Sequence, residues 1–201
     1  MTPEPKLPKR KLTRFPAFDY TSFGPYFITV CTHQRKCLLG TIHSATINLS
    51  SSGEIVRATW LALRRKFPGL VMDEFVVMPN HIRGILGILR TQDVVPVGAV
   101  LAPPARSVGN IRTLGSIVGA FKSISTIEVN RTFGTKGVAL WQRNYHEHVN
   151  QNGSALAQIQ RYIVENPLVW DSDPENPKAT SSTGGARPTP TTKIAGSKKT
   201  K

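Results

Sequence analysis

The sequence predicts an α+β fold in which helices pack on one antiparallel β-sheet, in the ferredoxin-like arrangement. Segments rich in β-branched and aromatic residues alternate with segments whose apolar residues recur at helical spacing. Two extended segments, 70–78 and 81–89, are separated only by Pro79-Asn80, and a connection this short joins antiparallel neighbours. The full order is strand, helix, strand, strand, helix, strand, helix. Such a sheet leaves one face or edge free for a ligand.

The first half of the chain supplies one strand and one helix before that strand pair. Residues 26–32 are dense in β-branched and aromatic side chains and follow the turn Gly24-Pro25, which indicates a strand. Residues 50–54 offer helix-capping side chains, and the helix after them ends at Pro68-Gly69. The apolar residues of this helix recur at roughly helical spacing. They are Ile55, Val56, Trp60, Leu63 and Phe67.

The second half supplies two more helices and a strand. The spacing predicts a helix over 114–130 with a buried stripe formed by Ile117, Val118, Phe121, Ile124 and Ile127. Residues 138–149 are expected to form a further strand. The last helix is expected over 154–165, with its inward positions at Leu156, Ile159 and Ile163. Pro167 stops it by disfavouring helical geometry at Asn166.

The 201 residues suit one domain with tails. Residues 1–16 are rich in Pro and Lys and are expected to be a disordered basic arm, followed by the domain over 17–171. Within it, 91–112 is expected to be a loop insertion. Residues 172–201 are rich in Ser, Thr, Pro and Lys and are expected to be a disordered tail with no core to join. No internal repeat is present.

Composition narrows the class of protein. The net charge of +14 favours a polyanionic partner such as nucleic acid. No apolar run is long enough to span a membrane, and no secretory signal is recognisable, so a cytoplasmic protein is expected. Cys31 and Cys37 are too few and too poorly spaced for a zinc site, and both are expected to be small buried side chains.

The strand at 81–89 nearly forms a metal-binding pattern. Residues two apart on a strand point the same way, so His81 and position 83 share a face. Two histidines there would hold a divalent metal. Position 83 is Arg83, which has no lone pair to offer and stays protonated at any biological pH.

The last helix carries a second candidate constellation. Tyr162 and Asn166 are four residues apart and therefore lie on the same side, with Gln158 one turn earlier. A phenol and a carboxamide would then project together. On these residues alone a simpler interpretation is favoured, in which Tyr162 lies at the edge of the core and Asn166 is a helix-terminal polar residue.

Several separate motifs occur in the order that one family shows. These motifs are Phe18–Tyr20, Gly24–Thr32, Asp73–His81, Gly119–Ser123, Trp141–Tyr145 and Tyr162–Pro167. By them the chain, from about Phe15 to Trp170, resembles REP-associated tyrosine transposases, within the single-tyrosine HUH transposases with an IS200-like domain.

The resemblance implies the ferredoxin-like IS200 transposase architecture and a DNA transposition activity. Single-stranded DNA would be cleaved and rejoined at hairpin-forming REP elements, with Tyr162 as the nucleophile and a 5′-phosphotyrosine intermediate. His81 and Asn166 would be ligands of Mg²⁺ or Mn²⁺, which would polarise the phosphate. No nucleotide cofactor is implied, and relatives suggest a monomer or homodimer.

Arg83 stands where the family pattern has its second histidine. Loss of that ligand is expected to weaken metal binding and cutting. One alternative is that Arg83 itself grips the scissile phosphate. Another is a protein that binds hairpin single-stranded DNA without cutting it. A ferredoxin-like RNA-binding domain is a third, although the expected aromatic signature is missing.

Other candidate residues are less specific. His146 and His148 form a second pair two apart, more simply interpreted as ordinary strand histidines. The positions of Gln151 and Gly153 also depart from the family, which usually has a basic and an acidic residue there. Besides Arg83, Lys122 and Arg143 are expected phosphate contacts, from a set of basic residues that a solvated surface explains equally well. The other members of that set are Arg64, Arg65, Lys66 and Arg131.

Overall fold

The structure is a computed structural model that describes residues 25–89, 113–149 and 153–179. The basic arm expected over 1–16, the loop expected over 91–112, Gln151 and the last part of the tail, 180–201, lie outside these ranges. None of the helices within the described ranges combines the length and apolar character needed to cross a membrane.

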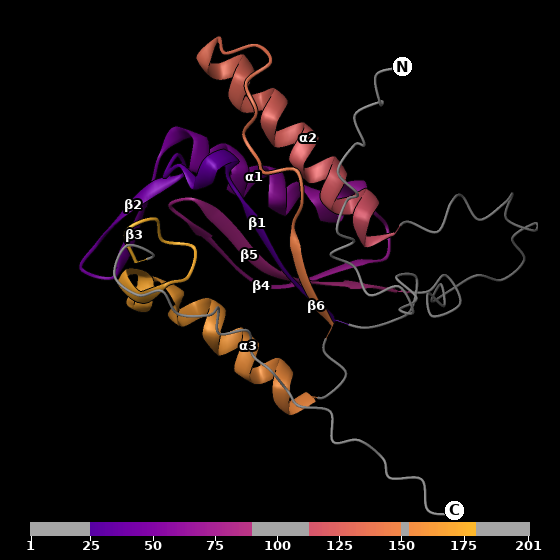
Figure 1. The fold of residues 1–201 in the computed structure, drawn as a ribbon. Coiled ribbons are helices and arrows are strands. Elements are labelled where there is room, and N and C mark those ends of the chain that lie inside the picture. Colours follow the sequence, from indigo (N-terminus) through magenta and orange to yellow (C-terminus); the bar gives the residue numbers. More distant parts are fainter. Residues whose placement is uncertain (1–24, 90–112, 150–152, 180–201) are drawn as a thin grey trace, which may run out of the picture.

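The described residues form a four-stranded antiparallel sheet with helices on both faces (Figure 1). The strand order is β4-β5-β1-β6. Helices α1 and α2 cover one face, and α3 lies on the other (Figure 1). The predicted α+β class, an antiparallel sheet with packed helices, is confirmed. The elements are β1 (Pro25–Cys31), α1 (Ser51–Lys66), β4 (Leu70–Met78), β5 (His81–Ile88), α2 (Leu114–Phe133), β6 (His146–Val149) and α3 (Gly153–Glu165).

A two-stranded hairpin of β2 (Gly40–His43) and β3 (Thr46–Leu49) was not predicted. Its turn places Ser44 and Ala45 at positive φ, 50° and 62°. Two-residue hairpin turns of this kind usually carry Asn-Gly or Asp-Gly, and those signals are absent here. Two short 3₁₀ segments, η1 (His33–Arg35) and η2 (Asn166–Ser172), complete the described elements.

The main core lies between the sheet and the pair α1 and α2. Trp60 of α1 is fully buried and packs against the middle of β5. A Cβ atom at Gly84 would lie 2.5 Å from Trp60 Cζ2, so glycine is required there for the indole to approach the strand. On the other face, Ile159 and Ile163 of α3 form a smaller cluster with Ile85.

Three local expectations are wrong. Strand β6 covers only His146–Val149 rather than 138–149, although Trp141 forms an isolated bridge with Thr32. Ile127 is exposed, because the inward side of the longer helix α2 passes through Ser125 and Val129. Cys31 is buried as expected, whereas Cys37 is exposed.

The expected start of the disordered tail at 172 also needs correction. The described chain continues to Ala179, and the side chains of Asp173, Glu175 and Asn176 are buried. Ion pairs and hydrogen bonds hold this segment in place. Contacts of this kind do not require apolar residues at regular spacing, so the sequence pattern did not reveal the segment. We call residues 170–176 the closing segment, since they lie over the residues described next.

Candidate functional site

The sheet face that carries α3 brings four of the predicted site residues into one cluster. His81 and Arg83 are two apart on β5 and are buried, at 0% and 4% exposure. Strand β1 places Cys31 and Thr29 directly opposite them. Tyr162 from α3 and Asn166 at the start of η2 reach the same place. Ile159 and Ile163 pack α3 against the sheet, and this packing sets the positions of Tyr162 and Asn166.

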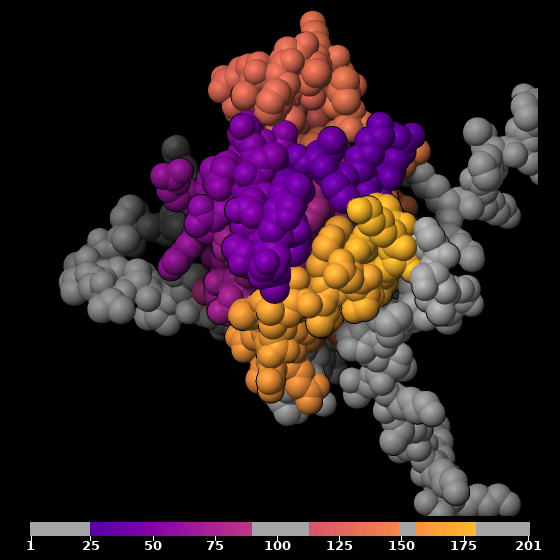
Figure 2. Space-filling view, turned by 90° about the vertical axis from the view of Figure 1, so that its left-hand side faces the viewer, coloured from indigo at the N-terminus to yellow at the C-terminus, as the bar shows by residue number. Residues whose placement is uncertain are grey.

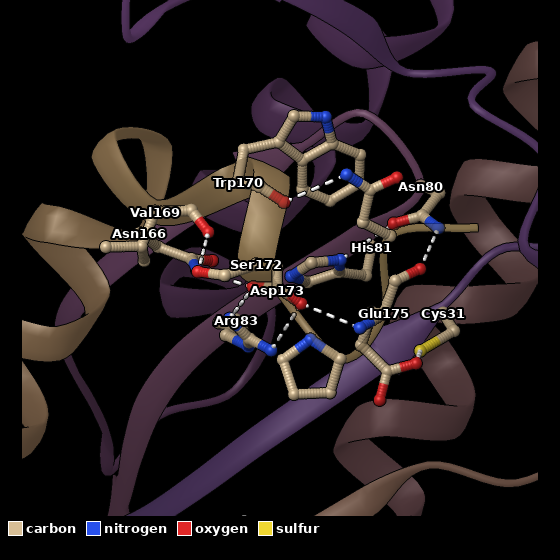
Figure 3. A network of polar contacts seen from close by, with 12 residues as sticks. Cys31, Asn80, His81, Arg83, Asn166, Val169, Trp170, Ser172, Asp173 and Glu175 are labelled. Carbon is tan, nitrogen blue, oxygen red and sulfur yellow. Dashed lines mark hydrogen bonds and ion pairs between the residues drawn. The ribbon is translucent and has the colours of Figure 1, made fainter. Parts of the chain in front are cut away.

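Asp173 is the centre of this cluster (Figure 3). Its Oδ2 atom accepts from Arg83 Nη1 and from Asn166 Nδ2, both at 2.6 Å. Its Oδ1 atom accepts from Arg83 Nη2 at 3.2 Å and from the backbone N–H of Glu175 at 2.8 Å. A carboxylate has about four lone-pair sites, and here four donors occupy them.

The charge on Asp173 is stabilised despite its burial. Burial alone would raise the pKa of this carboxyl group, but the Arg83 guanidinium and the hydrogen bonds that Arg83 and Asn166 donate outweigh it, so the pKa lies below its usual value. The side chains of Arg83 and Asp173 are 5% and 0% exposed. Arg83 and Asp173 thus form a buried, bidentate ion pair.

The His81 ring is neutral, and one of its nitrogen atoms has no hydrogen-bond partner among the described residues. Asn80 Nδ2 donates to the carbonyls of Arg35 and Glu175, so Asn80 Oδ1 must be an acceptor. It lies 2.8 Å from His81 Nδ1, which therefore carries the proton. Burial, with the nearby Arg83 charge as a second cause, lowers the pKa of His81 to about 3. The Nε2 lone pair thus faces the cluster.

Asn166 contributes a second bare acceptor. Its Nδ2 atom is used by Asp173, and its side chain is fully buried. Neither Asn166 Oδ1 nor His81 Nε2 has a hydrogen-bond partner among the described residues. They belong to His81 and Asn166, the two residues that the family resemblance implies as metal ligands.

Tyr162 lies at the outer edge of the cluster. The Arg83 Cζ atom is 5.0 Å from the centroid of its ring, a cation–π distance, and Phe27 meets the ring edge-on at 6.2 Å. The side chain remains 39% exposed. Burial raises the pKa of Tyr162, with Arg83 partly opposing it, so the phenol is protonated at neutral pH.

The closing segment covers His81 and the inner end of the cluster. The Trp170 ring lies 6.2 Å from the His81 ring, centroid to centroid. Glu175 pairs with Arg35 at 3.0 Å and accepts from Cys31 Sγ at 3.3 Å. Burial and then Glu175 raise the pKa of Cys31 to about 12. Figure 2 shows the yellow C-terminal part of the described chain packed against the indigo N-terminal part.

The other two expected phosphate contacts lie elsewhere. Lys122 belongs to α2, on the opposite face of the sheet. Its Nζ atom donates to the carbonyls of Gln142 and Arg143 at 2.5 and 2.9 Å, so it fixes the chain before β6. The Arg143 side chain is exposed on that same connection. The structure therefore does not bring Lys122 or Arg143 to the cluster.

The second histidine pair lies on β6, which is separated from β5 by strand β1. Thr29 of β1 pairs with Arg83 on one side and with His146 on the other. His148 pairs with Phe27, which contacts Tyr162. His146 and His148 thus face the α3 side of the sheet, and strand β1 lies between them and His81.

The side chains present do not fit a divalent cation. A hard cation such as Mg²⁺ prefers oxygen ligands and usually takes at least one carboxylate. The carboxylate of Asp173 is fully used, and the third position is a guanidinium that repels a cation. Only two neutral atoms remain. Among the described residues, no group of three or more His, Cys, Asp or Glu side chains could hold a metal ion.

Asp173 and Glu175 are the residues that sequence reasoning missed. They are the two acidic side chains of the basic segment 172–201, and both are buried against cationic partners. No local pattern singled them out, because the segment that carries them has the composition of a tail.

Comparison with known proteins finds a relative by sequence and several similar structures. No family model matches the sequence. A protein of Haemophilus influenzae, described as uncharacterized, is 34% identical over 167 residues, which are 82% of this chain and 91% of that protein.

Two of the similar structures are of transposases. One is a REP-associated tyrosine transposase bound to a REP hairpin, with a TM-score of 0.48 and 20% identity over 72% of this chain and 67% of that chain. The other, of Deinococcus radiodurans and assigned as a transposase, has a TM-score of 0.41 and 18% identity over 77% and 96%. At these identities the likeness concerns the fold alone. By sequence, this chain belongs to the same protein family as the Haemophilus influenzae protein.

Proposed function

We propose that this protein is a tyrosine-transposase relative that binds hairpin-forming single-stranded DNA and cuts it poorly or not at all. The observation that carries this proposal is the buried Arg83–Asp173 pair beside Tyr162. It stands where the family motifs would require a cation to activate a phosphate.

DNA binding is supported by charge and by the transposase motifs. The net charge of +14 attracts polyanions. The last turn of α1 carries three successive basic residues, Arg64, Arg65 and Lys66, on an exposed surface. Arg65 and Lys66 also line a shallow groove between α1 and α2. Contacts of this type bind the DNA backbone without reading its sequence.

Weak cutting is supported by the state of the nucleophile. A phenol attacks a phosphodiester only after losing its proton, and burial raises the pKa of Tyr162. The nearby positive charge, Arg83, is already engaged by a buried carboxylate. Two of the five N–H donors of Arg83 bond to Asp173, and this carboxylate offsets the charge that Arg83 could offer to a phosphate.

Cutting by Tyr162 is the second candidate function, and the exposure of this residue favours it. Its ring is 39% exposed and lies against a guanidinium that could stabilise negative charge. The phenol oxygen would bond to phosphorus while the 3′ oxygen leaves with its electron pair. The phenol proton would pass to water, and the product would be a 5′-phosphotyrosine.

One pair of assays separates these functions. Fluorescence anisotropy measures binding of the full chain to a DNA hairpin with single-stranded flanks, and to a linear oligonucleotide of the same composition. We expect tighter binding to the hairpin that weakens as salt rises. Denaturing gels then detect a covalent adduct, with Tyr162→Phe as control. Equal, weak binding to both oligonucleotides contradicts the proposal, and a Tyr162-dependent adduct establishes the second candidate.

A further inference from the structure

We propose that the Arg83 guanidinium, with Asp173 as its built-in counter-ion, takes the place of a divalent cation in this cluster. The protein would then take up neither Mg²⁺ nor Mn²⁺ at His81 and Asn166, and the cluster would hold its shape without metal. This inference concerns ion binding alone and does not depend on whether the protein binds DNA.

The first support is the way in which Arg83 is buried. A guanidinium that is 4% exposed needs a fixed counter-ion, and Asp173 supplies one through two hydrogen bonds, at 2.6 and 3.2 Å. Asp173 is brought there by the closing segment, which Glu175 anchors through Arg35 and through the Asn80 amide. An accidental substitution of a ligand by arginine would leave the charge unpaired. Here a separate part of the chain neutralises it.

The second support is that Asp173 joins Arg83 to Asn166. Asn166 Nδ2 donates to the same Oδ2 atom that receives Arg83 Nη1. A metal ion bridges residues of different elements by accepting their lone pairs. In this cluster a carboxylate performs that bridging by accepting their N–H groups, and so ties β5 to the end of α3.

The third support is the pair of atoms left over. His81 Nε2 and Asn166 Oδ1 are buried acceptors without a partner among the described residues. They are two ligands of a site that lacks its third ligand and its negative charge. Changing Arg83 to histidine would restore a nitrogen ligand at the strand position and would free lone pairs on Asp173. Four protein donors would then be available.

The test is Mn²⁺ binding by the full chain after EDTA treatment and dialysis, measured from loss of the electron paramagnetic resonance signal of free Mn²⁺. For the wild type we expect the same weak uptake as for His81→Ala, since the other histidines contribute equally to both. Arg83→His should bind about one further equivalent, at least roughly 10 to 100-fold tighter than the wild type. Arg83→His with His81→Ala should lose it. Arg83→Lys, which keeps a positive charge beside Asp173 and adds no lone pair, is the matched control and should stay near wild type.

Two results would overturn the inference. One is an equivalent of Mn²⁺ bound by the wild type and lost in His81→Ala, which decides the matter even if Arg83→His does not fold. The other is a folded Arg83→His protein, checked by circular dichroism, that binds no more Mn²⁺ than the wild type. Hairpin binding is measured separately in EDTA, so failure of the proposed function is seen independently.

Discussion

Replacing Asp173 with asparagine should destabilise the protein far more than breaking an exposed ion pair of the same length. Asp173→Asn keeps the shape of the side chain but leaves the Arg83 charge buried without compensation. Removing one partner of a buried pair typically costs about 3 to 5 kcal/mol. Both side chains are at most 5% exposed, so solvent cannot replace the lost partner.

The matched control is Glu128→Gln on α2. Glu128 pairs with Arg131 at 2.6 Å, the same distance as in the buried pair, but the two side chains are 37% and 76% exposed. Exposed pairs contribute about 0 to 1 kcal/mol. Urea unfolding followed by tryptophan fluorescence gives both free energies of unfolding. A loss in Asp173→Asn no greater than in Glu128→Gln would refute the assigned geometry. Arg83→Met with Asp173→Leu should recover only part of the stability, because Asn166 Nδ2 and the Glu175 N–H lose their acceptor as well.

Three further predictions follow from the same contacts. His81 binds a proton near pH 6.5 in the unfolded chain but only near pH 3 in the folded chain. The free energy of unfolding should therefore decrease as the pH is lowered from about 6.5 to about 3. The slope approaches roughly 1.4 kcal/mol per pH unit, and His81→Gln should lack it; Asp173, with its lowered pKa, adds a loss only below about pH 4. A thiol reagent should modify the exposed Cys37 and leave Cys31 unmodified until urea unfolds the chain. Modification of both thiols in the folded protein would contradict the burial of Cys31. Truncation after Asp171 should lower the melting temperature, whereas truncation after Ala179 should not; equal melting temperatures would show that the closing segment contributes nothing.

The helices and strands with regularly spaced apolar residues were predictable, because this spacing marks the face that is buried. The pair β4 and β5 follows from two apolar runs around Pro79-Asn80, and Ser50 caps α1 by accepting from the Gly53 N–H. The hairpin β2–β3 was not predictable in this way. Its strands are four residues each, and its turn uses Ser44 and Ala45 in a conformation that neither residue favours.

The candidate site was predictable in part. The periods of strand and helix place His81 and Arg83 on one face and Tyr162 near Asn166, and the structure has them in one cluster. Their partner Asp173 is 90 residues from Arg83 in the chain. No local periodicity reports an ion pair over such a separation. The segment that carries it is rich in Pro and polar residues, a composition typical of tails.

The most direct test of the account is nuclear magnetic resonance of the histidine rings and arginine guanidinium groups while Mn²⁺ is added. Paramagnetic Mn²⁺ broadens the signals of nuclei close to it. We expect the His81 and Arg83 signals to stay sharp, with the Arg83 N–H groups protected from exchange by Asp173. Selective broadening of His81 at low Mn²⁺ would contradict the account, because it would place a metal ion where the ion pair is assigned.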